Sequence, residues 1–300
     1  MNICLVGNNL TSLILSKTLI NSGAILDIFY FKNKKNSPSI RTIGISKSNI
    51  DFINNNICQL KLKNFNKISK IQIFSEDKQK ILDFSNKEEM LFSLLKADEL
   101  YNFLFKNLKK SKFFKIKKTN EGIFKKKFFL QSKYDLIINC ESNNFLNRKY
   151  FNNKLKKKYN NTAFTTLIAH QTIKNCVAKQ YFTSFGPLAF LPLSKNTTSV
   201  VFSSYNTKEF NKKNLKDFII NHKGNLKIKK FSNFEKINLN FLVARKYYHD
   251  KILLFGDGLH QIHPLAGQGF NMILRDIKIL LKLINEKNSL GISIDQSLLN

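Results

Sequence analysis

The segment between residues 253 and 271 constrains this chain most. Residues 253–257, LLFGD, predict a short apolar strand that ends in Gly-Asp, and residues 267–269, GQG, predict a turn that opens a helix. A carboxylate at a strand end accepts hydrogen bonds from sugar or polyol hydroxyls, and a helix N-terminus offers unpaired N–H groups to an electron-rich group. Together they suit a flavin, with Asp257 on the ribityl chain and the Gly267–Asn271 turn against the ring. The alternative is an ordinary strand, loop and helix in which the glycines only permit turns.

The N-terminus predicts a β-α-β unit. Ile3–Val6 is a short apolar run, Leu10–Asn21 has apolar residues at helical spacing with Gly23 behind it, and Ile25–Phe31 is a second apolar run. Strands joined in this way form a parallel pair with a right-handed crossover. The unit therefore predicts the start of a parallel sheet.

The turn inside this unit keeps part of a dinucleotide-binding pattern. Such a turn has the form G-x-G-x-x-G and is followed by a ribose-binding acid at the end of the second strand. Here Gly7 remains, Asn9 and Ser12 stand at the next two glycine positions, and Tyr30 stands near the place of the acid. Two interpretations stay open, a modified nucleotide site and a β-α-β unit with a purely structural role.

The middle of the chain predicts a mostly antiparallel sheet. The runs Ala163–Thr172, Gln180–Phe185 and Ser199–Tyr205 are rich in β-forming residues and carry few helix signals. The chain then returns to its first region and ends in a helix over Gly267–Asn285. The apolar stripe of that helix is Ile273, Ile277, Leu280 and Ile284.

Three further segments complete the prediction. Asp98–Lys109 is expected to be a helix with Asp98 as its N-cap. Phe113–Leu130 alternates weakly and is expected to form a basic hairpin. The Lys- and Asn-rich stretch Lys154–Asn161 is expected to be a solvated connection between domains.

Positive charge dominates the composition. The 300 residues carry 50 Lys+Arg against 20 Asp+Glu, a formal net charge of +30. Lys, Asn, Ile and Phe are all abundant, as expected when codons drift toward A and T. The lysine runs at 109–112, 125–127 and 154–158 could bind nucleic acid, but they lack interleaved arginines, so a solvated face is the preferred interpretation. Attraction to anionic membranes comes second.

Cysteine and histidine predict neither a disulfide framework nor a metal site. His260 and His263 lack a third ligand at suitable spacing and are interpreted as loop residues. Met1 runs almost directly into a strand, and no apolar run reaches the roughly 18 residues that span a membrane. The expectation is a cytoplasmic protein, with peripheral membrane association left open. The cysteines, scattered as expected in a reducing compartment, are Cys4, Cys58, Cys140 and Cys176.

The same residues resemble a known family. Gly256–Asn271 (GDGLHQIHPLAGQGFN), followed by LRD at 274–276, is similar to the second FAD fingerprint of group A flavin monooxygenases, and more narrowly of the ubiquinone-biosynthesis aromatic hydroxylases. Arg41–Ser46 (RTIGIS) resembles that family's R-x-x-A-L-S segment. Gly186–Leu193 (GPLAFLPL) resembles its G-P-L-A-L-L-P-L segment. The matches run in the expected order along nearly the whole chain.

The resemblance implies both a fold and an activity. The fold is α/β, with a Rossmann-like FAD-binding domain interleaved with a mostly antiparallel β-sheet substrate domain. Residues 1–65, 95–152 and 242–300 would form the first domain, and 66–94 and 153–241 the second. The implied activity is FAD-dependent aromatic-ring hydroxylation in ubiquinone biosynthesis, with NAD(P)H and O₂ acting on a prenylated phenol. Contacts with the inner membrane and with other quinone-biosynthesis proteins are also expected.

The resemblance also supplies a candidate site but no acid–base residue. Arg41 would approach the flavin, Asp257 would hold the ribityl chain, and Pro264 would help to shape the oxygen side. The cofactor-binding candidates are Gly7, Asn9, Ser12, Arg41, Gly256, Asp257, Pro264, Gly267, Gln268, Gly269 and Asn271. One face of the middle sheet would roof an apolar pocket, although most of its aromatics are interpreted as core: Phe164, Tyr181, Phe182, Phe185, Phe190 and Phe202.

Some positions depart from the family pattern. Glu141-Ser142 stands where the family has Asp-Gly, with Arg148 retained, and Tyr101 stands where the family has a basic or polar flavin contact. The sequence ends at Gly291–Asn300, where the family carries further helices. These departures motivate an alternative, a catalytically impaired and FAD-free member that acts as a structural subunit of a quinone-biosynthesis assembly.

Overall fold

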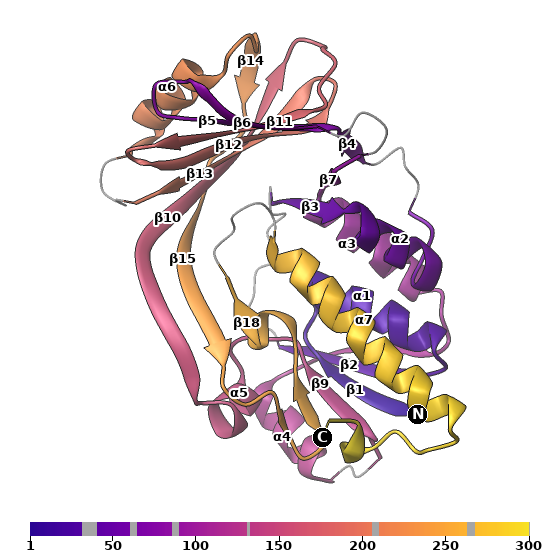
Figure 1. Cartoon of the computed structure of the whole chain (residues 1–300). Coiled ribbons are helices and arrows are strands. Elements are labelled where there is room, and N and C mark those ends of the chain that lie inside the picture. Colours follow the sequence, from indigo (N-terminus) through magenta and orange to yellow (C-terminus); the bar gives the residue numbers. More distant parts are fainter. Residues whose placement is uncertain are drawn as a thin grey trace.

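Three sheets organise the molecule (Figure 1). A six-stranded sheet contains the N-terminal strand, a nine-stranded sheet lies at the opposite end, and a three-stranded sheet lies between them. The computed structural model describes residues 1–31, 41–60, 65–85, 90–130, 133–205, 210–262 and 268–299.

The six-stranded sheet grows from the predicted β-α-β unit. Strand β1 pairs in parallel with β2 and β9, which confirms the parallel pair, and β16 at one edge is antiparallel. The order across the sheet is β16 (Tyr248–His249), β17 (Ile252–Leu254), β9 (Leu136–Asn139), β1 (Asn2–Val6), β2 (Ile25–Phe31) and β8 (Phe114–Thr119).

Helices cover both faces of this sheet, so its central strands are apolar on both sides. Ile3 and Leu5 of β1 pack into one core with α1, α2, α3 and α7, whereas Cys4 and Val6 pack into another with α4 and α5. The bounds are α1 Leu10–Asn21, α2 Lys47–Asn56, α3 Ala97–Leu108, α4 Glu121–Leu130, α5 Phe145–Tyr150 and α7 Gln268–Ser289. The predicted stripe of α7 is confirmed, since all four of its residues are buried.

The nine-stranded sheet is mostly antiparallel, as predicted. Its long strands β10 and β15 run from beside the six-stranded sheet to the far end of the molecule (Figure 1). The order is β18 (His260–Gln261), β15 (Glu235–Ala244), β10 (Lys154–His170), β13 (Thr197–Ser204), β12 (Gly186–Ser194), β11 (Val177–Thr183), β5 (Lys70–Phe74) and β6 (Lys80–Ser85). Strand β14 (Ile228–Phe231) also pairs with β10, and helix α6 (Lys212–His222) covers one face.

The small sheet connects these two regions. Strand β7 (Phe92–Lys96) pairs with both β3 (Thr42–Ser46) and β4 (Asn66–Ile68). Ile68 and Leu94 of this sheet pack against Ala178 of the nine-stranded sheet. This contact fixes one face of the large sheet toward the α/β part of the molecule.

Three local predictions are wrong. The predicted hairpin over Phe113–Leu130 is strand β8 followed by helix α4, because the Asn120 side chain accepts the Ile123 N–H at 2.8 Å and starts a helix. Asp98 does not cap α3, which begins at Ala97, and its carboxylate instead accepts the N–H of Glu99. The predicted connection at Lys154–Asn161 is the start of strand β10, which pairs with β15.

Candidate functional site

Three loops meet where β1, β9 and β17 end. These strands are parallel neighbours, so their carboxyl ends lie at one edge of the sheet, the usual place for ligands in such folds. The loops pack tightly: a Cβ on Gly7 would lie 3.0 Å from Glu141 Cγ, and one on Gly258 would lie 2.8 Å from the Glu141 carbonyl oxygen. Sequence reasoning singled out Gly7, but the packing of Gly258 against Glu141 depends on long-range pairing and carried no local signal.

Gly256 starts the loop after β17 in a conformation that favours glycine. Its φ is +57°, and a Cβ there would lie 2.7 Å from Thr11 Cγ2 in the first turn of α1. The residues Gly256–Gly258 form a single 3₁₀ turn, η2. The β17 loop and the β1 loop, nearly 250 residues apart in sequence, are therefore in contact through Gly256.

Asp257 lies half-buried in this turn. Its carbonyl oxygen accepts a hydrogen bond from Gln261 Nε2 at 3.1 Å. Within the described part of the chain, no hydrogen bond engages its carboxylate. Burial, followed by the charges of Asp257 and Glu141, raises the pKa of the Cys140 thiol, so both carboxylates lie close to the end of β9. The Asp257 carboxylate is an acceptor available to a ligand.

Asn9 and Ser12 form a capping box at the start of α1. Asn9 Oδ1 accepts the Ser12 N–H at 2.9 Å, and Ser12 Oγ accepts the Asn9 N–H at 2.9 Å. Asn9 Nδ2 also donates to the Cys140 carbonyl oxygen at 3.0 Å. Side chains at the two lost glycine positions thus satisfy backbone groups that would otherwise face a ligand.

Tyr101 of α3 reaches the same turn. Its hydroxyl donates to Asn8 Oδ1 at 2.8 Å, and its ring stacks on Phe105 with centroids 5.8 Å apart. Burial raises the pKa of Tyr101, although the Asn8 hydrogen bond opposes that effect. The phenol is therefore a protonated donor at neutral pH that holds α3 against the turn after β1.

Asn271 fixes the first turn of α7 to the small sheet. Its Nδ2 donates to the Gly44 carbonyl oxygen at 2.8 Å, and its Oδ1 accepts the Ser46 N–H at 3.1 Å. The same oxygen accepts a hydrogen bond from Asn49 Nδ2 at 2.8 Å. The Asn271 amide therefore orients the N-terminus of α7.

The other predicted residues are placed as follows. Gln268 is exposed and Gly269 half-buried at the start of α7, while Pro264 and Gly267 lie outside the described residues. Arg41 is exposed, and its carbonyl oxygen accepts the Ala97 N–H at 2.9 Å at the start of α3.

His260, predicted to be a loop residue, lies in the short strand β18. Its Nε2 lies 2.9 Å from Asp276 Oδ2 on α7, and both side chains are mostly buried. This pair ties the nine-stranded sheet to the helix that follows the β17 loop. In the described part of the chain, no group of three or more His, Cys, Asp or Glu residues could hold a metal.

The carboxyl end of β2 bears no acid. Tyr30 and Phe31 stand there, and the nearest acid along β2, Asp27, is already engaged. Asp27 Oδ2 accepts hydrogen bonds from the Tyr134 hydroxyl at 2.6 Å and from Lys133 Nζ at 3.1 Å. Burial raises the pKa of Asp27, but these hydrogen bonds and the charges of Lys117 and Lys133 together outweigh burial and lower the pKa. Asp27 is a structural residue of the sheet.

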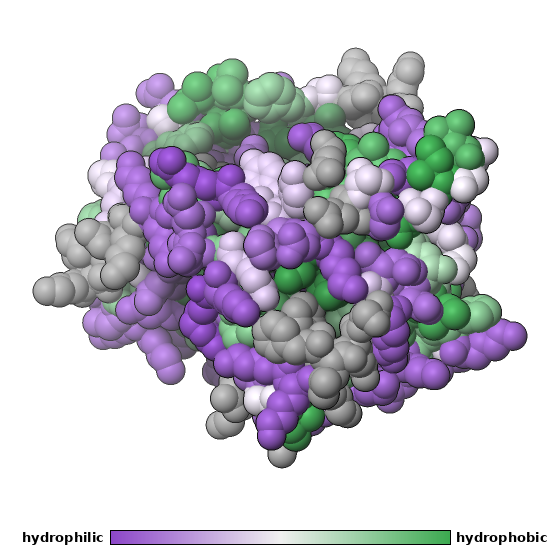
Figure 2. All heavy atoms as spheres, turned by 90° about the horizontal axis from the view of Figure 1, so that it is seen from below, coloured by the Kyte–Doolittle hydropathy of each residue, from purple (hydrophilic) through white to green (hydrophobic). Residues whose placement is uncertain are grey.

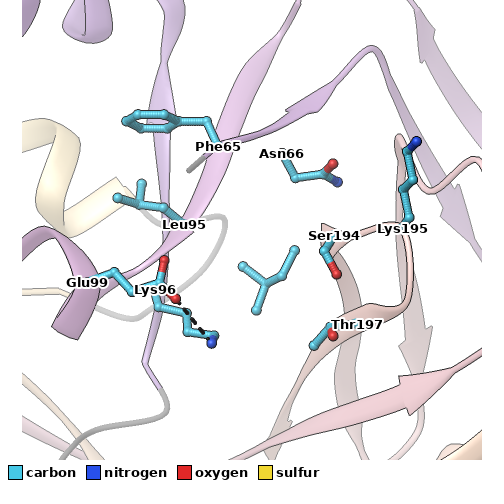
Figure 3. Close-up of a pocket in the computed structure, with 9 residues that line it drawn as sticks. Phe65, Asn66, Leu95, Lys96, Glu99, Ser194, Lys195 and Thr197 are labelled. Atoms are coloured by element: carbon cyan, nitrogen blue, oxygen red, sulfur yellow. Dashed lines mark ion pairs between the residues drawn. The ribbon is translucent and has the colours of Figure 1, made fainter. Parts of the chain in front are cut away.

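A cavity of about 400 Å³ lies between the small sheet and the β12–β13 turn (Figure 3). Its wall includes Phe65 and Leu95 on one side and Ser194 and Thr197 on the other. The Lys96 ammonium and the Glu99 carboxylate form an ion pair of 3.2 Å within it.

The lysine runs lie mainly on the surface. Figure 2 shows hydrophilic residues over much of the face seen from below, and Lys109, Lys110 and Lys125 are exposed. Lys154 is an exception, since its Nζ donates to Asn147 Oδ1 at 2.6 Å and burial lowers its pKa. No helix within the described ranges is long and apolar enough to cross a membrane.

Comparisons with known proteins agree with this geometry. Residues 154–288 match the family model described as FAD binding domain. The chain is 28% identical over 145 residues to the ubiquinone hydroxylase UbiL of Rhodospirillum rubrum, which covers 45% of this chain and 33% of that protein. It is 33% identical over 118 residues to the 3-demethoxyubiquinol 3-hydroxylase of Escherichia coli, covering 37% of this chain and 30% of that protein. The matches thus span about a third of these curated relatives.

Solved structures show the same fold. The p-nitrophenol 4-monooxygenase PnpA of Pseudomonas putida superposes with a TM-score of 0.77 at 11% identity, covering 99% of this chain and 82% of that one. HpxO of Klebsiella pneumoniae, solved with FAD and uric acid, gives a TM-score of 0.70 at 11% identity, covering 95% and 79%. The predicted fold class and the predicted resemblance are confirmed.

The described residues fit FAD better at one side of the site than at the other. Near β17, the Asp257 carboxylate is unengaged by hydrogen bonds within the described ranges, and the Gly258 backbone approaches its neighbours too closely for a Cβ. Acceptors of this kind suit a polyol chain. Near β1 and β2, the Asn9 side chain already accepts a hydrogen bond from the Ser12 N–H of helix α1. Tyr30 stands in place of a ribose-binding acid. The fit is therefore to the ribityl portion of the cofactor.

Proposed function

Because this chain is similar in sequence to ubiquinone hydroxylases and folds like FAD-dependent monooxygenases, we propose that it is an FAD-dependent aromatic-ring hydroxylase of quinone biosynthesis. Its substrates would be a prenylated phenol, NAD(P)H and O₂. The observation that carries the proposal is the loop after β17, where Gly256 contacts Thr11 of α1 and Asp257 lies half-buried at the carboxyl edge of the sheet.

The chain's own residues would bind and orient the flavin. Asp257 would accept hydrogen bonds from ribityl hydroxyls, and the N-terminus of α7 would favour negative charge at the ring's carbonyl edge. Asn271 would keep that helix end in position through its contacts with Gly44 and Ser46. Bound FAD would supply the redox chemistry and oxygen activation, while the protein supplies position and field.

The remaining candidates have more peripheral roles in this proposal. Gly7, Asn9 and Ser12 would shape the turn beside the adenylate part, and Arg41 would approach the flavin from β3. Pro264, Gly267, Gln268 and Gly269 would shape the ring side. The cation excess would hold the protein at anionic surfaces, as a cytoplasmic protein peripheral to a membrane.

A second function has one observation in its favour. The Asn9–Ser12 capping box closes the start of α1 without a ligand, which suits an FAD-free structural subunit of a quinone-biosynthesis assembly. This function and the first differ in whether flavin binds at all.

The visible spectrum of the purified chain, before and after incubation with FAD, tests the proposal. A flavoprotein spectrum that survives gel filtration supports the hydroxylase. A folded protein that stays colourless after reconstitution contradicts it and favours the structural subunit. NAD(P)H consumption with a prenylated phenol then tests the reaction itself.

A further inference from the structure

His260 and Asp276 form a mostly buried pair that has no role in the function proposed above. His260 Nε2 lies 2.9 Å from Asp276 Oδ2, and the two side chains are 11% and 31% exposed. An ionised carboxylate only accepts hydrogen bonds, so Nε2 carries the hydrogen that is donated. Within the described ranges, neither side chain has another hydrogen-bond partner. The pair is therefore a single directed contact between β18 and α7.

Strand β18 continues the loop that carries Asp257. Only Leu259 separates the turn η2 from β18. Gln261 of β18 also donates from Nε2 to the Asp257 carbonyl oxygen at 3.1 Å. The strand has only two residues, and both pair with β15. Because so short a strand has few ladder hydrogen bonds, the side-chain contacts of β18 help to fix the position of Asp257.

Helix α7 is held at two levels by two different sheets. In its first turn, Asn271 Nδ2 donates to the Gly44 carbonyl oxygen of the small sheet at 2.8 Å. Asp276 lies five residues further along the helix, which is about 7.5 Å along its axis. There it meets β18 of the nine-stranded sheet, and Figure 1 shows β18 beside the N-terminal half of α7. The two contacts together fix the direction of the helix, because a helix held at one level alone can tilt.

The direction of α7 matters for the candidate site because a helix end acts over a short range. The favourable field of a helix N-terminus falls off within the first turn. Groups that bind a ligand have to be held to within about 0.5 Å and about 10–20° of the productive geometry. A tilt of α7 about Asn271 would move its N-terminus relative to Asp257. Stability alone does not account for the pair, since apolar residues of similar volume stabilise a buried site at least as well as an ion pair.

We propose that His260 and Asp276 are positioning residues of the flavin site, and that the hydrogen bond between them sets the direction of α7 relative to Asp257. We call these two residues the β18–α7 pair. The assignment rests on the proposed function, because it requires Asp257 to bind the ribityl chain and the N-terminus of α7 to face the ring. It gives a role to a histidine that the sequence indicated as an ordinary loop residue, and to the aspartate of the LRD segment at 274–276.

Loss of the hydrogen-bond donor should weaken flavin binding. The variant His260→Leu has no donor, and it should weaken the binding of flavin mononucleotide and of FAD equally, by about tenfold. The anionic reduced flavin depends more on the helix N-terminus than the oxidised flavin does, so its binding should weaken by about a further threefold. Fluorescence titration of the full chain measures the first loss. A fall in the midpoint potential of the bound flavin measures the second.

Two further variants separate positioning from packing. His260→Gln keeps an N–H donor at a similar reach and should bind flavin within about twofold of the native chain. His260→Leu/Asp276→Leu leaves no unpaired carboxylate, so it should unfold at the native denaturant midpoint while binding flavin as weakly as His260→Leu. The matched control is Lys282→Gln/Glu286→Gln, which removes an exposed ion pair of 3.6 Å on α7 itself. The control should change neither flavin affinity nor midpoint potential.

Three results would overturn the role of the β18–α7 pair. The first is native flavin affinity and midpoint potential in His260→Leu, and the second is flavin binding in His260→Gln as weak as in His260→Leu. The third is recovery of flavin affinity together with stability in His260→Leu/Asp276→Leu, which would make the pair a packing contact. A native chain that binds no flavin refutes the proposed function and this role with it. Native binding beside any of the three results refutes the role of the pair and leaves the proposed function standing.

Discussion

The loops that follow β1 and β17 lie side by side at one edge of the sheet, yet they differ in what their polar groups do. After β1, Asn9 and Ser12 satisfy each other and the start of α1. After β17, the Asp257 carboxylate has no hydrogen-bond partner within the described ranges, and Gly256 brings the backbone against Thr11. One turn is complete without a ligand, while the other presents an acceptor to one.

This difference implies that the two halves of the cofactor contribute unequally to its affinity. A helix N-terminus has up to four unpaired N–H groups, and a capping box removes part of the anion-binding capacity that a pyrophosphate would use. The β17 side keeps its acceptor and its close backbone approach. We therefore expect most of the flavin affinity to come from the ring and ribityl side.

The largest effect is expected from Gly256→Ala. The added methyl would lie 2.7 Å from Thr11 Cγ2 at a φ of +57°, so flavin retention should be lost and the free energy of unfolding should fall by about 2–4 kcal/mol. Gly291→Ala is the matched control, since Gly291 has a φ of +66° with no atom within 4 Å of the Cβ position. Denaturant unfolding measures the stability of each variant, and flavin absorbance measures its flavin retention. Equal behaviour of the two variants would show that the contact with Thr11 has no role.

Asp257→Asn should weaken flavin binding by about tenfold to a hundredfold, because a hydrogen bond to a charged acceptor contributes about 1.5–3 kcal/mol. The half-buried position should leave thermal stability nearly unchanged. Fluorescence titration with FAD and with flavin mononucleotide should show equal losses, since both carry the ribityl chain. Asp250→Asn, at a carboxylate that is 71% exposed, is the control. A native affinity in Asp257→Asn would rule out the proposed ribityl contact.

Asn9→Gly should change the binding of the adenylate half of FAD, which lies beside the β1 turn in this proposal. Removing the cap should lower the free energy of unfolding by a few tenths of a kcal/mol while exposing the first N–H groups of α1. FAD should then bind about threefold to tenfold more tightly, with flavin mononucleotide unchanged. Asn211→Gly removes a similar cap from the remote helix α6 and should change stability alone. A loss of FAD affinity in Asn9→Gly would mean that the Asn9 side chain itself holds the cofactor.

Tyr101→Phe should give the smallest effect. The change removes the hydrogen bond to Asn8 but keeps the stacking on Phe105. The free energy of unfolding should therefore fall by about 1 kcal/mol or less. FAD affinity should fall by about twofold to fivefold as the β1 turn loosens. Tyr181→Phe in the remote sheet is the comparison. A tenfold or greater loss would identify Tyr101 as a direct flavin contact.

Local patterns in the sequence predicted the elements that local physics determines. Apolar spacing identified Leu10–Asn21 and the buried stripe of α7 because a helix repeats its face every 3.6 residues. Weak alternation wrongly predicted a hairpin over Phe113–Leu130, where Asn120 starts a helix after a single strand.

The site was only partly predictable for a different reason. Gly256 and Asp257 could be recognised from a motif, but the contact of Gly256 with Thr11 and the clamp from Asn271 to Gly44 join distant segments. Which aromatics of the nine-stranded sheet belong to the core beneath α6 depended on strand register, which sets the face of every side chain at once. Pro264 and Gly267 stay predictions.

A titration of the native chain with FAD and, separately, with flavin mononucleotide tests most directly whether the β17 loop and the start of α7 hold the flavin ring. If they do, both ligands give a perturbed flavin spectrum and their dissociation constants lie within about tenfold of each other, because the adenylate half adds little. An unperturbed spectrum with flavin mononucleotide beside tight FAD binding would place the affinity at the β1 turn and contradict a ring site at the β17 loop.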